Sequence, residues 1–191
     1  MTSLPALRTE RLALRPARAD DAPRLRALWD APPVRRYLFD DEPVDEARAG
    51  AVLSDCLALA PRGLGLWTLA PRDAAEPAAS GALLGCAALL PVGTAAEYHP
   101  PSAGLVEPLI SLDPASWGRG YAAEALAALV GHALRPRAEG GLGLPCLAAA
   151  ADVPNEASLR LLGRLGFRQV AETPGPKYRL RHFLLEAGNR E

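Results

Sequence analysis

The chain contains 191 residues, of which 21 are Lys or Arg and 22 are Asp or Glu, and its formal charge is -1. This length allows a sizeable hydrophobic core but is short for two ordinary domains, so we expect one domain over residues 1–191. The balanced charge gives no overall field that attracts nucleic acid or an anionic membrane, so neither is an expected partner.

The cysteines indicate a reducing compartment. Cys56, Cys86 and Cys146 are odd in number, far apart and embedded in apolar sequence, which is typical of buried thiols rather than of a disulfide framework or a zinc site. The N-terminal "MTSLPALRTERL" lacks the pattern of a secretory signal, and the run "ALLGCAALLPV" is too short to span a bilayer. We therefore expect a cytoplasmic protein.

The first third of the chain predicts one strand followed by two helices. Leu12 and Leu14 lie on one face of the strand. The first helix opens at Asp20 or Asp21, with Pro23 in its first turn. Its apolar side consists of Leu25, Leu28 and Trp29, and that of the second helix, which begins near Asp45, consists of Val52, Leu53, Cys56 and Leu57.

The middle of the chain predicts three strands. The first two are "LWTLA" and "GALLGCAALL", joined by the Pro- and Ala-rich connector "PRDAAEPAASG". The third is "LVEPLISL", in which Pro108 has no backbone N–H to donate. Pro108 therefore predicts an edge strand or a bulge.

The last third predicts two helices that alternate with strands. The first helix begins at Tyr121, and its apolar side consists of Leu126, Leu129, Val130 and Leu134. After the strand "LPCLAAAA", Asn155 caps a second helix that Gly166 ends, with apolar contacts from Leu161, Leu162 and Leu165. The final strands are "FRQVAE" and "YRLRHFLLEA". The whole order predicts a mixed α/β fold.

Two glycines, Gly118 and Gly120, stand directly before the helix that begins at Tyr121. Such glycines let backbone N–H groups converge on an anion at the positive end of the helix dipole, and a phosphate is the natural ligand. The alternative is a tight turn that binds nothing. No Gly-Lys-Ser/Thr follows and no third glycine completes a dinucleotide fingerprint, which argues against an ATPase or a dehydrogenase.

The loop from Trp117 to Ala122 resembles the pyrophosphate-binding loop of the GNAT superfamily of acyl-CoA-dependent N-acetyltransferases. Its tryptophan and the continuation "GYAAEAL" are similar to the branch that contains the ribosomal-protein N-terminal acetyltransferases. Further stretches resemble that branch in the same order: "LRTERLALRP", "DAPPVRRYL" as a turn between the first helices, "LLGCAAL", "VEPLISLDPASWGRGYAAEA" and "NEASLRLLGRLGF". The resemblance covers almost the whole chain.

The resemblance implies a mostly antiparallel central sheet with helices on both faces, whose fourth and fifth strands splay apart around the pantetheine arm of acetyl-CoA. Backbone amides of the loop would hold the pyrophosphate, Ser111 and Leu112 would pair with pantetheine, and Asn155 would contact the cofactor. Arg119 either adds charge or is a solvated side chain. The implied cofactor residues are Ser111, Leu112, Trp117, Gly118, Arg119, Gly120, Tyr121, Ala122, Ala123 and Asn155.

Acetyl transfer to an amine needs an uncharged nitrogen and a proton for the departing thiolate, so a base is useful. By resemblance Glu107 is the base candidate, although the chain reads Glu107-Pro108-Leu109-Ile110 where the branch often carries Glu-Ile-Gly-Tyr. Ser158 is the candidate proton donor. The alternatives are a solvated strand carboxylate for Glu107 and a helix-capping contact for Ser158.

The remaining polar residues carry weaker hypotheses. Tyr98 and His99 either line the acceptor entrance or belong to a surface loop, and His132 and His182 are expected to be structural because no metal-ligand spacing links them. No cysteine has an activating neighbour in the sequence, which favours direct attack on acetyl-CoA over an acyl-cysteine.

Two functions therefore stay open at this stage. One is an enzyme that acetylates a primary amine, either a protein N-terminus or a small molecule, with acetyl-CoA as cosubstrate and no metal. The other is a catalytically altered acyl-CoA-binding sensor or interaction module, which the missing Gly-Tyr pair and Pro108 allow. The oligomeric state, monomer or homodimer, also stays open.

Overall fold

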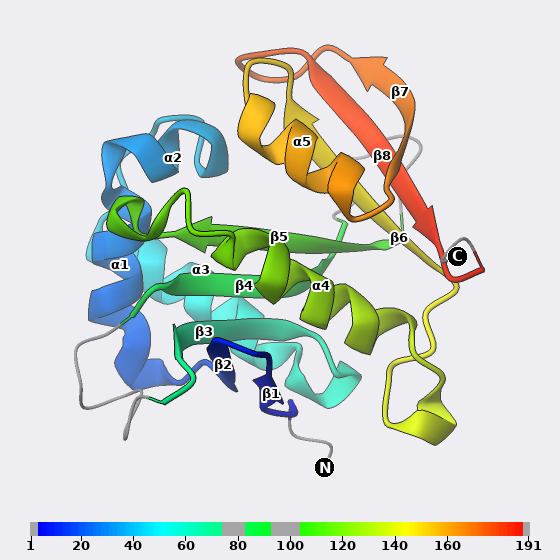
Figure 1. Cartoon of the computed structure of the whole chain (residues 1–191). Coiled ribbons are helices and arrows are strands. Elements are labelled where there is room, and N and C mark those ends of the chain that lie inside the picture. Colours follow the sequence, from blue (N-terminus) through cyan, green and yellow to red (C-terminus); the bar gives the residue numbers. More distant parts are fainter. Residues whose placement is uncertain (1–3, 74–82, 93–103, 189–191) are drawn as a thin grey trace. The chain divides into compact units, whose positions relative to one another are not determined.

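The structure is a computed structural model that describes residues 4–73, 83–92 and 104–188. Its strands and helices are shown in Figure 1. The strands are β1 (Leu7–Arg8), β2 (Leu12–Pro16), β3 (Gly65–Pro71), β4 (Gly85–Pro91), β5 (Val106–Leu112), β6 (Cys146–Asp152), β7 (Arg168–Thr173) and β8 (Leu180–Glu186). The helices are α1 (Ala22–Asp30), α2 (Pro32–Leu38), α3 (Glu46–Ala58), α4 (Tyr121–Leu134) and α5 (Glu156–Arg164).

The strands follow the order β1-β2-β3-β4-β5-β6-β8-β7 in one open sheet. Among the described strand pairs, only β5 and β6 are recorded as parallel, and the others are antiparallel. The predicted mixed α/β fold with a mostly antiparallel sheet is thus confirmed. The chain forms two compact units, Met1–Leu89 with Leu109–Leu129, and Leu90–Pro108 with Val130–Glu191, which are described separately.

The core of the first unit lies between β2, β3 and the helices that pack on them. Leu12 and Leu14 of β2 are buried as predicted, and Trp67 and Leu69 of β3 are fully buried beside them. Burial of each large apolar side chain stabilises the unit by about 1.5–3 kcal/mol. The predicted apolar side of α1, formed by Leu25, Leu28 and Trp29, is also buried.

The predicted pair of N-terminal helices is wrong in number, because the structure has α1, α2 and α3. The additional helix α2 begins at Pro32, within a stretch that we expected to be a turn. Its two prolines fit the first turn of a helix, where the N–H that proline lacks would have no helical partner. The other predicted helix is α3, and its N-cap is Asp45, whose carboxylate accepts a hydrogen bond from the Arg48 N–H at 2.8 Å.

The second unit contains the antiparallel strands β6, β8 and β7, and Figure 1 shows α5 lying over them. Asn155 caps α5 as predicted, and Gly166, with φ +86°, follows its end. Of the three leucines expected to supply apolar contacts in this helix, only Leu162 is buried, whereas Leu161 and Leu165 are partly exposed. His182 of β8 is completely buried and its Nε2 lies 2.8 Å from the Thr173 hydroxyl, which agrees with a structural role.

Strand β5 contradicts one of the two alternatives predicted from Pro108, the edge strand. It lies between β4 and β6 in the strand order and is therefore not an edge strand. The pairing between β5 and β6 is recorded only at Val106 and Leu147, so Pro108 breaks none of the recorded pairs with β6. These are the fourth and fifth strands of the sequence prediction, and their single paired position agrees with the predicted splaying. Strand β4 begins at Gly85, later than predicted, and the connector over residues 74–82 lies outside the described residues.

Candidate functional site

The two glycines before α4 adopt backbone conformations that other residues rarely tolerate. Gly118 has φ +73° and Gly120 has φ +80°. A Cβ atom on Gly118 would meet nothing within 4 Å, so backbone conformation rather than lack of space calls for glycine there. Together with Trp117 and Arg119, these glycines form an exposed loop that we call the glycine loop (residues 117–120).

The glycine loop ends at the N-terminus of α4. The first hydrogen bond of the helix joins the Glu124 N–H to the Gly120 carbonyl at 3.1 Å. The preceding amides of Tyr121, Ala122 and Ala123 therefore have no acceptor within the helix, and the helix dipole adds positive potential at the same place. This end of α4 can accept a pyrophosphate group, as the sequence predicts.

Sequence reasoning missed Arg11, which lies against the glycine loop in the first unit. Its guanidinium donates to the Arg119 carbonyl at 2.9 Å and lies 4.9 Å from the centre of the Tyr121 ring. The same guanidinium forms an ion pair of 2.6 Å with Glu124, and the Arg11 N–H and the Thr9 hydroxyl also donate to that carboxylate. Only the "LRTERL" resemblance drew attention to this segment, and it assigned Arg11 no role.

Ser111 and Leu112 lie at the end of β5 that leads into the glycine loop. The Ser111 hydroxyl is buried 3.2 Å from the Cys86 thiol, and the Leu112 carbonyl accepts a hydrogen bond from the Trp117 indole at 2.9 Å. The Trp117 side chain, 49% exposed, therefore folds back onto the strand that precedes its loop. The pairing of these strand residues with pantetheine stays a prediction.

Glu107 lies on β5 within the second unit and is partly buried. One of its carboxylate oxygens accepts a hydrogen bond from the Ala150 N–H of β6 at 2.8 Å. Burial raises the pKa of Glu107 to about 7, and the hydrogen bond from Ala150 opposes this shift. A carboxylate with this pKa can take up and release protons near neutral pH, as a general base must.

Asn155 and Ser158 lie together at the start of α5. The Asn155 side-chain oxygen accepts a hydrogen bond from the Ser158 N–H at 3.2 Å, which is the capping contact weighed as an alternative for this pair. Ser158 is partly buried. The capping contact uses the backbone of Ser158, so it does not prevent its hydroxyl from donating a proton.

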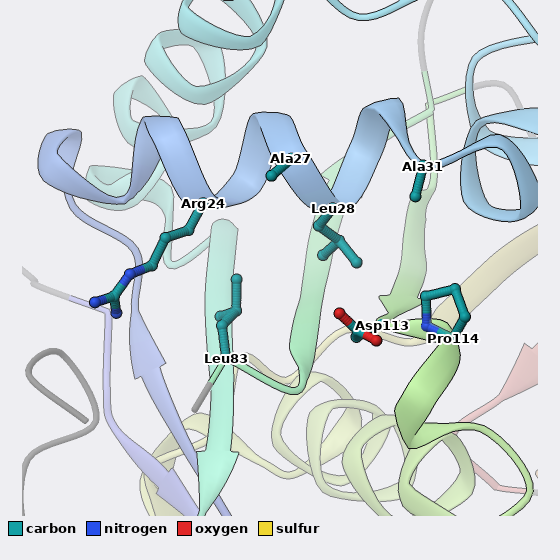
Figure 2. Close-up of a pocket in the computed structure, with 7 residues that line it drawn as sticks. All are labelled: Arg24, Ala27, Leu28, Ala31, Leu83, Asp113 and Pro114. Carbon is teal, nitrogen blue, oxygen red and sulfur yellow. The ribbon is translucent and has the colours of Figure 1, made fainter. Parts of the chain in front are cut away.

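A pocket of about 240 Å³ lies in the first unit between α1 and the residues that flank β4 and β5. Figure 2 shows Leu28 projecting from α1 toward Asp113, with Leu83 and Pro114 alongside. Asp113 is already engaged, because its carboxylate accepts a hydrogen bond from the Ala115 N–H at 2.8 Å. None of the site residues predicted from the sequence lines this pocket.

The described cysteines are free thiols, and burial raises the pKa of Cys56 to about 11 and that of Cys86 above its ordinary value. Protonated thiols are poor nucleophiles, which agrees with direct transfer. Within residues 4–73, 83–92 and 104–188, no group of three or more His, Cys, Asp or Glu side chains could hold a metal ion. Tyr98 and His99 lie outside the described residues.

A family model described as an acetyltransferase (GNAT) domain matches residues 11–168. The chain belongs to this family. It is therefore a GNAT acetyltransferase, and acetyl-CoA is the cosubstrate that this family uses. The match includes Arg11, the glycine loop, Glu107, Asn155 and Ser158.

Solved structures support the GNAT fold over almost the whole chain, whereas a search of curated protein sequences finds no significant match. An acetyltransferase from Agrobacterium tumefaciens is 26% identical, with a TM-score of 0.75 over 96% of this chain and 95% of that one. A ribosomal L7/L12 α-N-protein acetyltransferase in complex with coenzyme A is 16% identical, with a TM-score of 0.70 over 96% and 97%.

A spermidine N-acetyltransferase from Vibrio cholerae, in complex with coenzyme A and spermine, is 15% identical, with a TM-score of 0.67 over 92% and 95% of the two chains. The predicted family, fold and enzyme class are thus confirmed. Among the described helices, none has both the length and the apolar character needed to cross a membrane.

Proposed function

We propose that this GNAT enzyme transfers the acetyl group of acetyl-CoA to a primary amine by direct attack of the amine. The observation that carries the proposal is the glycine loop, whose left-handed glycines lead into the free amides at the start of α4. In this proposal the amides of residues 118–123 bind the pyrophosphate, Arg119 adds positive charge, and Trp117 closes the loop onto β5. Ser111 and Leu112 offer backbone groups to pantetheine, and Asn155 contacts the cofactor.

Glu107 acts as the base in this proposal. A typical alkylamine has a pKa of about 10.4 and is mostly protonated at neutral pH, so the nucleophile must first lose a proton. Glu107 takes this proton, directly or through a water molecule, because its raised pKa lets it do so near pH 7. The amine nitrogen then bonds to the thioester carbon and the carbon–sulfur bond breaks. Ser158 supplies a proton to the departing thiolate and regains one from the attacked nitrogen, which loses its second proton as the amide forms.

The acceptor is a protein N-terminus or a small-molecule amine. Among the structural neighbours, one acetylates a ribosomal protein at its α-amino group and another is a spermidine acetyltransferase. These neighbours support an amine as the acceptor but do not distinguish a protein N-terminus from a small-molecule amine. We further propose that residues 1–191 function as one acetyltransferase domain, because the family match runs through both compact units. The free thiols are compatible with a cytoplasmic location.

The test is release of coenzyme A thiol from acetyl-CoA by the purified protein, across matched panels of peptides and small amines. We expect turnover with members of one panel, and we expect Glu107→Gln to lower kcat by about 10²-fold or more without weakening coenzyme A binding. Tight coenzyme A binding with no turnover on any acceptor would favour the sensor or interaction module instead. Unchanged turnover of Glu107→Gln across pH would remove Glu107 from the base role.

A further inference from the structure

A charged pair links the N-terminal segment of the chain to the glycine loop. Arg11, in the turn between β1 and β2, contacts the Glu124 carboxylate through its Nε at 2.7 Å and its Nη2 at 2.6 Å, and both nitrogens converge on the same oxygen, Oε2. The two residues are separated by 113 positions in the sequence and both belong to the first compact unit. Two nitrogens of one planar guanidinium on the same oxygen restrict the orientation of the Arg11 side chain, which a single point charge would not do.

The Glu124 carboxylate is satisfied on both oxygens. The Thr9 hydroxyl, at 2.5 Å, and the Arg11 N–H, at 2.8 Å, donate to Oε1, while the Arg11 guanidinium binds Oε2. Burial alone would raise the pKa of Glu124, but these hydrogen bonds hold it below its ordinary value, so the group is ionised at neutral pH. An ionised carboxylate in the first turn of α4 is favourable for the helix but would repel a bound pyrophosphate if Arg11 did not neutralise it.

Arg11 also holds the glycine loop itself. Its Nη1 donates to the carbonyl of Arg119, the residue between the two left-handed glycines, and its guanidinium lies over the Tyr121 ring. A Cβ atom on Gly120 would lie 3.4 Å from Arg11 Nη2, so the side chain passes directly beside the loop. Because residues 117–120 are exposed, the core does not fix their backbone, and a contact to the Arg119 carbonyl restricts the conformations that they can adopt.

We infer that Arg11 and Glu124 form a positioning pair that holds the glycine loop in the conformation that binds the coenzyme A pyrophosphate. The inference rests on the proposed function and adds residues outside the loop. Arg11 acts through the loop backbone, and Glu124 acts by orienting Arg11. The affinity of the site for coenzyme A therefore depends on a side chain that stands more than 100 positions before the loop in the chain.

The pair makes a prediction opposite in sign to that of simple electrostatics. Glu124→Met removes a negative charge near the anion site, so charge alone would tighten coenzyme A binding. Loss of positioning instead weakens it. We expect Arg11→Met and Glu124→Met each to raise the Kd for coenzyme A on the order of tenfold, and the double variant to be no weaker than the worse single variant.

The measurement is calorimetric titration of the full chain with coenzyme A, together with the KM for acetyl-CoA, the KM for the acceptor and kcat. The KM for acetyl-CoA should rise while the acceptor KM and the kcat at saturation stay within about twofold, which a general loss of folded protein would not produce. Arg48→Met is the matched control, because Arg48 also donates to a backbone carbonyl, that of Pro43, and lies over an aromatic ring, that of Phe39. It should bind coenzyme A as the wild type does.

Several outcomes would overturn the inference. Wild-type or tighter binding by Glu124→Met would do so, as would additive effects in the double variant. If Arg11→Met does not fold, Arg11→Lys takes its place, because it keeps the charge but has one nitrogen instead of the three that contact Glu124 and Arg119; a wild-type Kd for coenzyme A in this variant would overturn the inference. Wild-type protein that fails to bind coenzyme A would overturn the proposed function and this inference with it, whereas normal wild-type binding with unaffected variants would overturn the positioning pair alone.

Discussion

At the scale of single residues, Glu107 has an environment that differs from that of an ordinary strand carboxylate. Resemblance located it on a strand before the glycine loop, but the sequence could not predict its hydrogen bond to the Ala150 N–H or the partial burial of its side chain. Both depend on β6, which lies about 40 positions later in the chain. The side chain thus carries an energetic cost that its proposed role as a base explains.

The raised pKa of Glu107 has a consequence for stability. The folded protein holds the proton up to about pH 7, whereas the unfolded chain releases it near the ordinary value of 4.5, so rising pH between these values destabilises the fold. Glu107→Gln removes this dependence. As the pH rises from about 5 to about 8, we expect the unfolding free energy of the variant to increase by about 1–3 kcal/mol relative to that of the wild type. Urea unfolding of both proteins at both pH values measures this increase. If the variant and the wild type differ in unfolding free energy by the same amount at the two pH values, the pKa of Glu107 is not raised.

Arg11 shows a different limit of prediction at the same scale. Nothing in "LRTERL" indicates that its arginine binds a carboxylate on a helix that starts more than 100 positions later. Periodicity and capping patterns report contacts between neighbours in the chain, whereas an ion pair of this kind follows from the tertiary fold. The glycine loop itself was predictable because the conformations of Gly118 and Gly120 are local properties.

At the scale of elements, local signals predicted most helices and strands correctly. The apolar sides of α1 and α4, the start of α3 near Asp45 and the cap Asn155 are present as expected. The short helix α2 was missed because consecutive prolines are typical of turns as well as of the first turn of a helix. The edge-strand alternative for Pro108 was wrong because the recorded pairing of β5 with β6 is limited to Val106, so an interior strand can contain this proline, which a proline rule cannot anticipate.

The cap of α5 allows its structural and cofactor roles to be separated. Asn155→Ala removes the acceptor for the Ser158 N–H and should cost about 1 kcal/mol in unfolding free energy. Asn155→Ser restores a capping oxygen and should recover most of this loss, but it lacks the amide. If Asn155 contacts the cofactor, both variants raise the KM for acetyl-CoA. An unchanged KM in Asn155→Ser would leave Asn155 as a cap alone.

At the scale of the whole molecule, the order of elements and the ordered matches to one branch were sufficient to predict the GNAT fold. They were not sufficient to predict the acceptor, because that choice depends on loops whose sequences carry no local code. The connectors over residues 74–82 and 93–103 also lie outside the described structure. Cofactor binding is therefore the property of the whole chain that the present structure allows to be tested most directly.

Coenzyme A should stabilise the folded chain, because a ligand that binds only the native state adds free energy by mass action. At about 100 times the Kd the gain is about 2.7 kcal/mol, which thermal unfolding with and without coenzyme A detects as a rise in Tm. Gly120→Glu should abolish this rise, since it places a bulky, negatively charged residue at a backbone φ of +80° beside the anion site.

Gly140→Glu is the matched control for this variant. Gly140 has the same φ of +80° and lies outside the glycine loop, in a turn that follows α4, so its substitution imposes similar backbone strain and the same change in charge. Both variants should lower the Tm of the ligand-free protein, but only Gly140→Glu should keep the rise with coenzyme A. A full rise in Gly120→Glu would exclude the glycine loop as the pyrophosphate site, because strain and charge would then be tolerated exactly where the anion is proposed to bind.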